Sequence, residues 1–358
     1  MKILHVTECF AGGVATAINM YASLAPEHEH MVLYTARRAN SPAELNPELF
    51  SQSWRLPDQH RAAIETVRRV RDQVAPDVIH THSSFAGAYV RLARLRGNKR
   101  RTPTVYTPHG VAFARKDISA LHRAVFYSAE WALSWVTSVF APCGQWEGEV
   151  LRRLNRRIPQ VVIPNATMPT GVTWNPTGVP TVAISGRVTP QRSPELFAAI
   201  ARRVHRERPE VEFQWLGGGD ADLTASLQRA GVHVTGWLDK DDLYSRLARV
   251  NVGLHTALWD GYPMAVLEMN DIGVPVLVQD IPALQECPAE ARFNGVDDAA
   301  RKVIRAIEEP ESLRNAWEKV QDNHSVATLA DALHECYSKA GGETKGRITI
   351  GIQVNKTY

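Results

Sequence analysis

The chain has 358 residues, of which 44% are hydrophobic and 22% charged, enough for two ordinary domains and unlike a disordered or collagen-like chain. Its formal net charge of +3 is too small to indicate nucleic-acid binding. Residues 1–180 nevertheless hold 21 Lys and Arg against 13 Asp and Glu, which favours an anionic partner or, equally, a solvated basic surface.

Residues 1–168 alternate between short apolar runs and longer amphipathic segments. The pattern predicts strands at 2–7, 30–35, 77–82, 104–107, 138–142 and 161–164, and helices at 14–24, 61–74, 85–95, 118–135 and 145–154. Strands alternating with helices indicate parallel strands joined by crossovers. We therefore expect residues 1–168 to form a doubly wound α/β domain.

A second alternating region follows a segment rich in Pro and Gly without charge, which predicts a linker at 169–180. The pattern then predicts strands at 181–185, 211–216, 233–235, 252–255 and 275–278, and helices at 194–207, 222–230, 241–249, 264–272, 297–307 and 311–321. We expect a second domain at 181–322, a C-terminal helix within 323–340 that packs back toward the first domain, and a tail at 341–358 without an assigned role. Two such domains face each other across a cleft, and ligands bind at the carboxyl ends of their strands.

The cysteines and the N-terminus indicate the compartment. The chain has four widely spaced cysteines: Cys9, Cys143, Cys287 and Cys336. Without a CxxC pair, we expect reduced, buried thiols. The N-terminal apolar stretch is too short for a signal peptide, which predicts a cytoplasmic protein. The most apolar window, 124–143, contains Glu130 and four Ser and Thr, so it predicts a buried helix running into a strand rather than a membrane span.

Three loops carry residues suited to binding. Gly12 and Gly13 follow the first strand and precede a helix, where glycine permits close approach of a ligand to unpaired N–H groups. Arg187 and Arg192 lie in the loop that opens the second domain, and two guanidinium groups beside a helix start suit a diphosphate. Taken singly, the first pattern also fits a plain tight turn and the second two surface arginines.

The third loop, from Trp259 to Glu268, follows a strand and opens a helix. Its two acids, Asp260 and Glu268, are suited to accept hydrogen bonds from vicinal hydroxyls of a ribose or a hexose. The preference of helix starts for acidic residues also explains Asp260, and explains Glu268 less well.

These three loops, at this spacing, resemble the family 4 glycosyltransferases over roughly residues 1–340. The family has a Gly-Gly loop after strand one, a GRxxxxKG segment and an E-x7-E motif containing GxPxxxLE. The resemblance implies an α/β, GT-B fold: two Rossmann-like doubly wound parallel-sheet domains facing across a cleft, the first binding the acceptor and the second the nucleotide sugar. The family lysine is Arg192 here, and the family's first glutamate is Asp260.

The resemblance also implies residue roles. Arg187 and Arg192 would hold the donor diphosphate, and Glu268 would bind the ribose. The donor sugar would be held by Asp260 and the segment after it, Gly261, Tyr262, Pro263, Met264 and Ala265. Gly12 and Gly13 would line the same site from domain one, and the base would lie near Gly236, Trp237 and Leu238. His109 matches a histidine that contacts the transferred sugar, so the implied catalytic set is His109, Asp260, Arg187 and Arg192.

No metal or other cofactor is assigned. His80 and His82 share a strand face, but no pair of acids lies near them in the sequence. Asp220 and Asp222 form a DxD pattern at a helix start, where N-capping is the favoured interpretation. The resemblance implies that arginines and helix ends neutralise the leaving group without a metal.

The leading hypothesis is a retaining glycosyltransferase that moves a hexose or N-acetylhexosamine from a UDP- or GDP-linked sugar to a hydroxyl of a glycan or polyprenyl-diphosphate-linked acceptor in cell-envelope polysaccharide synthesis. Residues 80–87 resemble those of family members that act on such acceptors. Basic stretches at 68–71 and 91–101 indicate either contact with an anionic membrane surface at its inner face or a solvated helix face. The alternative hypotheses are a nucleotide-sugar epimerase or phosphorylase of the same fold and an inactive nucleotide-sugar-binding partner. No oligomeric state is predicted.

Overall fold

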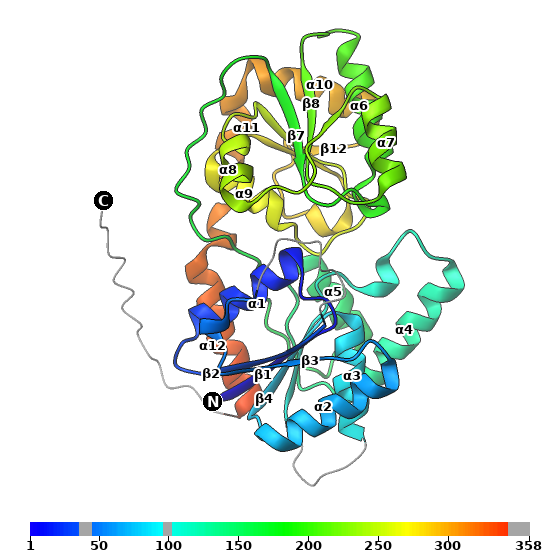
Figure 1. Cartoon of the computed structure of the whole chain (residues 1–358), viewed down its shortest axis with the longest axis vertical. Coiled ribbons are helices and arrows are strands. Elements are labelled where there is room, and N and C mark those ends of the chain that lie inside the picture. Colours follow the sequence, from blue (N-terminus) through cyan, green and yellow to red (C-terminus); the bar gives the residue numbers. More distant parts are fainter. Residues whose placement is uncertain (36–44, 96–101, 343–358) are drawn as a thin grey trace.

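The chain forms two α/β domains, one above the other in Figure 1. The structure is a computed structural model and describes residues 1–35, 45–95 and 102–342. Most of the tail predicted at 341–358 therefore lies outside the described residues, as does the 96–101 part of the second basic stretch.

The first domain is built on a parallel sheet with the order β3-β2-β1-β4-β5-β6. Its strands are β1 (Lys2–Thr7), β2 (Glu29–Tyr34), β3 (Gln52–Arg55), β4 (Val78–His82), β5 (Thr104–Thr107) and β6 (Val139–Phe140). Its helices are α1 (Gly12–Leu24), α2 (His60–Val74), α3 (Ser84–Leu95), α4 (Ala120–Ser134) and α5 (Gln145–Leu154).

The second domain is built on a parallel sheet with the order β12-β11-β10-β7-β8-β9. Its strands are β7 (Thr181–Ser185), β8 (Glu212–Leu216), β9 (His233–Val234), β10 (Val252–His255), β11 (Val276–Gln279) and β12 (Arg292–Phe293). Its helices are α6 (Pro194–His205), α7 (Ala221–Arg229), α8 (Lys240–Leu247), α9 (Met264–Ile272), α10 (Gly295–Glu308) and α11 (Pro310–Glu318), and α12 (Val326–Gly341) follows them.

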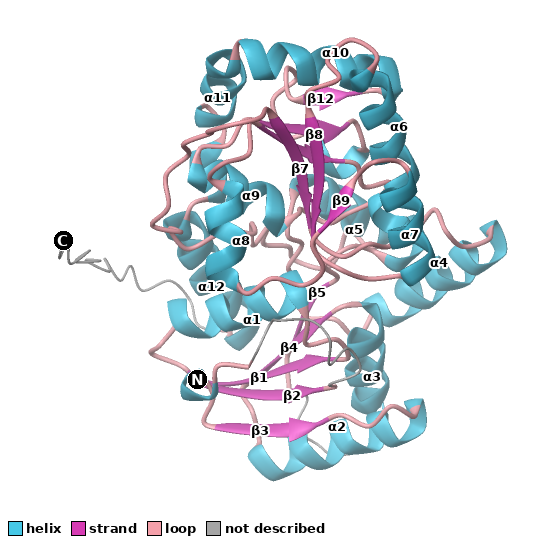
Figure 2. Cartoon of the chain, turned by 45° about the horizontal axis from the view of Figure 1, so that its top comes forward, coloured by secondary structure: helices cyan, strands magenta, loops and turns pink. Residues whose placement is uncertain are grey.

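Both sheets share one topology. Counted along each domain, the strand order is 3-2-1-4-5-6, the order of a Rossmann fold. Figure 2 shows the two sheets as separate layers of strands with helices around each. In this topology the chain switches direction between strands one and four, which are β1 and β4 in the first sheet and β7 and β10 in the second. Loops that leave these four strands at their carboxyl ends border the ligand-binding crevice. The topology of both sheets confirms the predicted doubly wound α/β fold.

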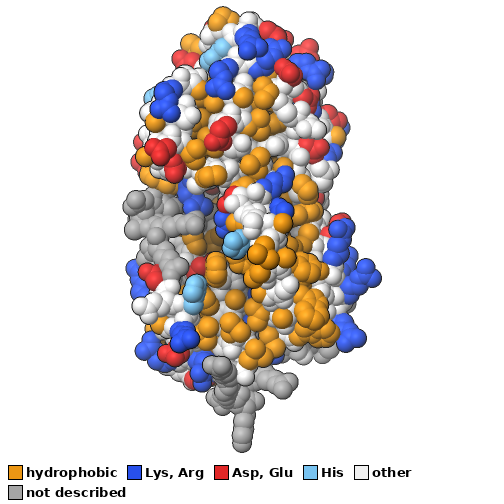
Figure 3. All heavy atoms as spheres, turned by 90° about the vertical axis from the view of Figure 1, so that its right-hand side faces the viewer, with side chains coloured by type: hydrophobic (Ala, Val, Ile, Leu, Met, Phe, Trp, Pro, Cys, Tyr) orange, Lys and Arg blue, Asp and Glu red, His pale blue; other side chains and the backbone are white. Residues whose placement is uncertain are grey.

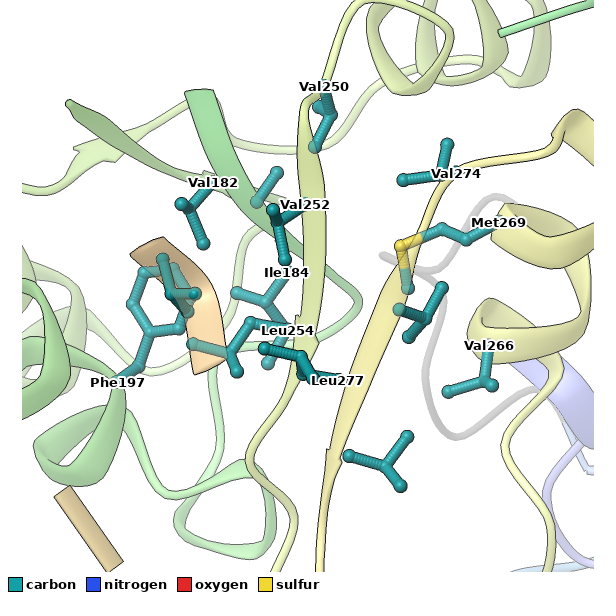
Figure 4. Close-up of a cluster of buried hydrophobic side chains, with 14 of the residues drawn as sticks. Val182, Ile184, Phe197, Val250, Val252, Leu254, Val266, Met269, Val274 and Leu277 are labelled. Atoms are coloured by element: carbon teal, nitrogen blue, oxygen red, sulfur yellow. The ribbon is translucent and has the colours of Figure 1, made fainter. Parts of the chain in front are cut away.

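Apolar strands explain why the second sheet is stable. Val182, Ile184, Val252 and Leu254 are almost fully buried and point toward helices that cover the sheet (Figure 4). Phe197 of α6 contributes an aromatic ring to the same cluster. Continuous apolar strands of this kind are expected where helices cover both faces of a parallel sheet.

Helix α12 belongs spatially to the first domain. It runs beside α1 in Figure 1, and its Leu333 and Tyr337 pack in a buried cluster with Ile3 of β1 and Tyr21 of α1. The chain therefore crosses the domain junction twice, before β7 and again before α12. No helix in the described part of the chain is both long and apolar enough to span a membrane.

Some predicted elements differ from the structure. Strands β3 and β12 were not predicted, and 161–164 is not a strand, although Val161 N donates to the Phe140 carbonyl at 3.0 Å. The prediction of a buried helix in 124–143 was wrong, because almost all of α4 is exposed and Trp131 keeps 50% of its surface. All four cysteines are free, and three are buried as expected, but Cys9 is partly exposed.

Candidate active site

Two helix starts meet where the domains face each other. Gly13 lies in the first turn of α1 and Met264 is the first residue of α9; a β-carbon on Gly13 would lie 3.1 Å from Met264 Cγ. Neither helix has a side-chain cap on its first N–H groups. Uncapped helix starts carry partial positive charge and free donors, so together they suit an anion between the domains.

The loops after β7 and β10 are joined by hydrogen bonds that position Arg192. Thr256 Oγ1 donates to the Arg192 carbonyl at 2.6 Å, and Gln191 Nε2 donates to the Trp259 carbonyl at 2.9 Å. These bonds hold the two loops of the topological switch point together. Arg192 is thereby placed on a fixed backbone rather than on a free loop.

Arg192 lies in a cluster with His255 and Asp260. Arg192 Nη1 donates to His255 Nδ1 at 3.0 Å and lies 3.9 Å from Asp260 Oδ2. His255 Nε2 approaches the same oxygen at 3.4 Å. Burial favours a raised Asp260 pKa, but the contact with His255 and the charge of Arg192 outweigh it and lower the pKa below its ordinary value. Asp260 is therefore an ionised acceptor beside a guanidinium group.

Asp260 has unused hydrogen-bonding capacity. Its Oδ1 accepts from Gly261 N at 2.8 Å, whereas its buried Oδ2 has no well-aligned donor among the described residues. Buried polar atoms without a partner are uncommon in folded proteins. A ligand hydroxyl would satisfy this oxygen.

Glu268 lies one turn into α9 and is partly buried. Tyr244 donates its hydroxyl to Glu268 Oε1 at 3.3 Å. Burial raises the Glu268 pKa to about 6, although Tyr244, Lys240 and Arg192 act against the rise. The carboxyl is thus ionised at neutral pH and becomes protonated in mild acid.

The glycine run 217–219 brings the predicted base-binding segment next to the loop of Arg187. A β-carbon on Gly217 would collide with the Gly186 carbonyl oxygen, so only glycine fits there. A β-carbon on the next glycine, Gly218, would lie 3.2 Å from Nε1 of Trp237, whose side chain is exposed. Arg187 is partly exposed in the same loop. The run explains how residues after β8 and β9 reach the edge of the site.

His109 follows β5 and brings the first domain to the same place. Its φ is +51°, and the next residue, Gly110, donates its N–H to Glu147 Oε1 at 2.7 Å. A β-carbon on Gly261 would lie 3.2 Å from Gly110 N, so the His109 loop abuts the Asp260 loop. Burial lowers the His109 pKa to about 4, so the ring is neutral at physiological pH.

A histidine cluster adjoins His109. The ring nitrogens of His5, His80 and His82 approach within 4.8 Å of one another, as the ligands of a metal ion do. Both nitrogens of each ring, however, have hydrogen-bond partners in the structure. The residues therefore fit a hydrogen-bonded network better than a metal centre.

The remaining candidate residues occupy different surroundings. The Tyr262 ring is buried and stacks on the His324 ring with 3.9 Å between the ring centroids, so the ring itself is not open to a ligand. Pro263 has no N–H and offers only its ring, while Ala265 is buried in the first turn of α9. Asp220 Oδ1 accepts from Asp222 N and Leu223 N, both at 3.0 Å, which confirms the N-cap.

Three site residues were missed by the sequence reasoning: His255, Tyr244 and Glu147. His255 ends an apolar strand, so the sequence pattern indicates a core residue there. Tyr244 lies on the apolar face of a helix, which also indicates a packing role. A signal did exist for Glu147, because it stands at the third position of a helix that begins after Gly144, where a carboxylate can reach back to backbone N–H groups. It accepts from Cys143 N at 2.9 Å as well as from Gly110 N.

Comparison with known proteins shows to which class of enzyme the chain belongs. A family model described as a glycosyl transferase 4-like domain matches residues 12–166, and one described as glycosyl transferases group 1 matches residues 179–338. The chain belongs to the glycosyltransferases with this pair of domains and the GT-B fold. The activity is therefore that of a glycosyltransferase, as the sequence predicted.

Individual proteins are similar to the chain over most of its length. One is the Escherichia coli UDP-Gal:alpha-D-GlcNAc-diphosphoundecaprenol alpha-1,3-galactosyltransferase, 23% identical over 73% of this chain and 75% of the relative. Sucrose-phosphate synthase from Thermosynechococcus elongatus superposes with a TM-score of 0.80 at 16% identity, covering 96% of this chain and 100% of that structure. The Anabaena protein HepE in complex with UDP and glucose gives a TM-score of 0.75 at 15% identity, covering 94% and 99%.

Proposed function

We propose that the protein is a retaining glycosyltransferase that moves a hexose or N-acetylhexosamine from a nucleoside-diphosphate sugar to a hydroxyl of a glycan or polyprenyl-diphosphate-linked acceptor. The observation that carries the proposal is the cluster of Arg192, His255 and Asp260 beside the uncapped start of α9, which faces the start of α1 from the other domain. A cation and free helix N–H groups suit a diphosphate, and a buried carboxylate oxygen that has no well-aligned donor among the described residues suits a sugar hydroxyl.

The chemical difficulty lies in the departing diphosphate. The bond between the anomeric carbon and the diphosphate oxygen breaks, and a bond to the acceptor oxygen forms on the same face of the sugar. The acceptor proton passes to the leaving diphosphate, so no protein nucleophile is required. Arg187, Arg192 and the start of α9 stabilise the negative charge that develops on the leaving group, and a metal is not needed for this role.

Two similar proteins support the donor and acceptor classes. The HepE structure contains UDP and glucose, and the Escherichia coli relative is named for a UDP-galactose donor and a diphosphoundecaprenol-linked acceptor. A nucleotide-sugar donor of this kind fits a site that has positive charges for a diphosphate and carboxylates for sugar hydroxyls. We propose a role in cell-envelope polysaccharide synthesis on this basis.

The proposal is tested by incubating the purified protein with UDP- and GDP-linked sugars and a synthetic polyprenyl-diphosphate-linked sugar. The expected product is an acceptor heavier by one sugar in mass spectrometry, with the donor's anomeric configuration in NMR. Conversion of the donor without acceptor would indicate an epimerase instead. Binding measured by thermal shift without turnover on any pair would indicate an inactive binding partner.

The donor KM is expected to depend on pH through Glu268. Its raised pKa of about 6 means that the carboxyl gains a proton as the pH falls through that value, and a protonated carboxyl is a poorer acceptor for the ribose hydroxyls. The donor KM should therefore rise up to about tenfold one pH unit below the pKa. Initial rates against pH measure this, and the rise should vanish in the Glu268→Gln variant. A KM in the native protein that is flat across this range would contradict the role.

The exposed side of α4 is a candidate membrane surface. Four exposed apolar residues of α4, together with Trp135 directly after the helix, form what we call the α4 face: Leu121, Val125, Tyr127, Trp131 and Trp135. Figure 3 shows hydrophobic side chains gathered on this side of the first domain, with Lys and Arg around them. Arg157 lies over the Trp135 ring at 5.5 Å, and Arg152, Arg153 and Arg156 are exposed close to it in sequence. Aromatic and basic residues together favour an anionic bilayer interface.

Two arginines of the basic stretches from which a membrane surface was predicted, Arg71 and Arg91, are buried and cannot belong to such a surface. Arg71 donates Nη1 to the Ala93 carbonyl at 3.1 Å and is buried, so it cannot reach a lipid headgroup. Arg91 is fully buried. Near α4, by contrast, Arg152, Arg153 and Arg156 are exposed.

Replacing Leu121 and Trp131 together with glutamate is expected to weaken binding to vesicles of anionic phospholipid by at least about tenfold, because both side chains lose apolar area that the bilayer would cover. Co-sedimentation measures the change. Val179→Glu is the matched control, since Val179 is a similarly exposed apolar residue in the linker. Native protein that stays in the supernatant with such vesicles would overturn the membrane surface while leaving the glycosyltransferase proposal intact.

A further inference from the structure

Four histidines form a continuous chain of hydrogen bonds through the first domain. His109 Nε2 lies 3.2 Å from His82 Nδ1, His82 Nε2 lies 3.1 Å from His5 Nδ1, and His5 Nε2 lies 3.0 Å from His30 Nδ1. The last ring ends the chain, because His30 Nε2 lies 2.9 Å from the Ala25 carbonyl oxygen. We call these four residues the histidine chain.

The sheet topology explains the geometry of the histidine chain. His82, His5 and His30 belong to β4, β1 and β2, which are adjacent in the sheet, and His109 follows the next strand, β5. In the strand register His82 pairs with Thr7, and His30 pairs with Ile3. Positions 3, 5 and 7 of a strand point to one face, so the rings step diagonally across that face from the domain junction toward Ala25.

The rings of the histidine chain are neutral. His5 and His82 are fully buried, and His30 is nearly so. Burial lowers the pKa of each of these three imidazoles, and it lowers that of His109 to about 4. A neutral imidazole has one N–H and one lone pair. Each ring can therefore donate only once.

The Ala25 carbonyl sets the direction of the histidine chain. A carbonyl only accepts, so the proton of His30 is on Nε2 and its Nδ1 accepts from His5. His5 then has its proton on Nε2 and accepts at Nδ1 from His82. His82 likewise has its proton on Nε2, so its Nδ1 accepts a hydrogen bond, and His109 must donate it from Nε2. One carbonyl at the far end thus determines the tautomer of the ring at the domain junction.

We propose that the histidine chain fixes His109 as the Nε2–H tautomer, leaving its Nδ1 lone pair as a hydrogen-bond acceptor for a hydroxyl of the transferred sugar. Among the described residues no hydrogen-bond partner is found for His109 Nδ1, and the side chain is partly exposed beside the Asp260 loop. His82, His5 and His30 are positioning residues that act through His109. The assignment of a sugar hydroxyl as the partner rests on the proposed function.

A fixed tautomer has consequences for specificity. An acceptor that cannot become a donor discriminates between a sugar with a hydroxyl at that position and a sugar that lacks it, because the deoxy sugar leaves the acceptor unpaired. In isolation, imidazole exchanges between its two tautomers and accepts or donates with either nitrogen. The histidine chain removes that freedom before the donor binds.

The tautomer is measured by long-range proton–nitrogen NMR of the full chain labelled with ¹⁵N-histidine, in the absence of donor. The His109 signals are assigned by their loss in His109→Gln. We expect the Nε2–H form for His109, His82, His5 and His30 at neutral pH. A Nδ1–H form or a mixture at His109 in the native protein would overturn the proposal, and this result does not depend on any activity.

Variants at His5 test whether the tautomer is set from a distance. His5→Phe removes the acceptor for His82 and should give a mixture of tautomers at His109, with a donor KM raised by about threefold to tenfold. His5→Gln should restore the single His109 tautomer and the native donor KM, because the amide oxygen accepts from His82 while the amide N–H donates to His30. His80→Phe is the matched control: His80 is equally buried in the same cluster but bonds to Tyr337 and Thr107 instead.

The possible outcomes distinguish the proposal for the histidine chain from the proposed glycosyltransferase function. An unchanged His109 tautomer in folded His5→Phe would overturn the histidine chain as its cause. If His5→Phe fails to fold, the tautomers of the native protein still decide the matter. A native protein with His109 in the Nε2–H form but without transfer from any donor would support the histidine chain and contradict the proposed function.

Discussion

Replacing Arg192 with alanine is expected to lower kcat/KM for the nucleotide-sugar donor by about a hundredfold or more, because a fixed donor aimed at a developing negative charge contributes that much to a rate. Arg192 is held by its backbone against the β10 loop and pairs with His255 and Asp260. The diphosphate gains charge as the sugar departs, so kcat should fall as well as donor affinity. Steady-state kinetics with a saturating acceptor measure both constants.

Arg192→Lys is the informative companion variant. Lysine keeps the charge but loses the planar fork that can contact His255 and two phosphate oxygens together. It should recover part of kcat/KM, as the lysine in the family pattern implies. Arg203→Ala is the matched control, because Arg203 of α6 pairs with Glu207 and Asp297 on the surface. An Arg192→Ala enzyme with native kcat and KM would exclude Arg192 from the donor site.

The overall fold could be predicted because its local signals agree. A strand such as Thr181–Ser185 is buried along its whole length, so it stands out as an apolar run between amphipathic helices. Strand β3 was missed for the opposite reason. Its sequence Gln-Ser-Trp-Arg lies at the sheet edge with little burial, so no apolar pattern marks it.

The candidate site could be predicted only where its residues share a loop with a recognisable pattern. Arg192 and Asp260 were found because glycine and proline mark the loops around them. His255, which touches both, was missed because it ends the apolar strand β10. The histidine chain could not be predicted for a related reason: its members come from three strands and the loop after a fourth, and their contacts depend on the register between the strands.

The basic stretch beginning at Arg91 shows how sequence reasoning goes wrong when a charged residue is buried. Arginine is rarely buried, so a run of basic residues predicts a surface segment. In the structure Arg91 is inaccessible to solvent and donates Nη2 to Glu130 Oε2 at 2.8 Å and Nε to the Gly87 carbonyl at 2.8 Å. Glu130 Oε1 also accepts from Tyr106 at 2.8 Å. Glu130 comes from α4, so this network attaches an otherwise exposed helix to the sheet.

Arg91→Met is therefore expected to destabilise the protein by ~3–5 kcal/mol, because it leaves the Glu130 carboxylate buried without its cation. That loss corresponds to a fall in Tm of about 10 °C for a domain of this size. Thermal unfolding measures it, and hydrogen exchange should show α4 opening first. Among the described residues of α4 only Glu130 and Ser134 are buried, so little else anchors the helix.

The double variant Arg91→Met/Glu130→Leu separates the loss of the ion pair from the loss of packing. Removing both charges leaves no unpaired carboxylate, so the double variant should be more stable than Arg91→Met alone. Arg123→Met is the matched control, since Arg123 is an exposed arginine of α4 and its replacement should leave Tm within about one degree. An Arg91→Met protein with native Tm would mean that the Glu130 carboxylate is satisfied without Arg91. The attachment of α4, and with it the orientation of the α4 face, would then depend on Tyr106 and Ser134 instead.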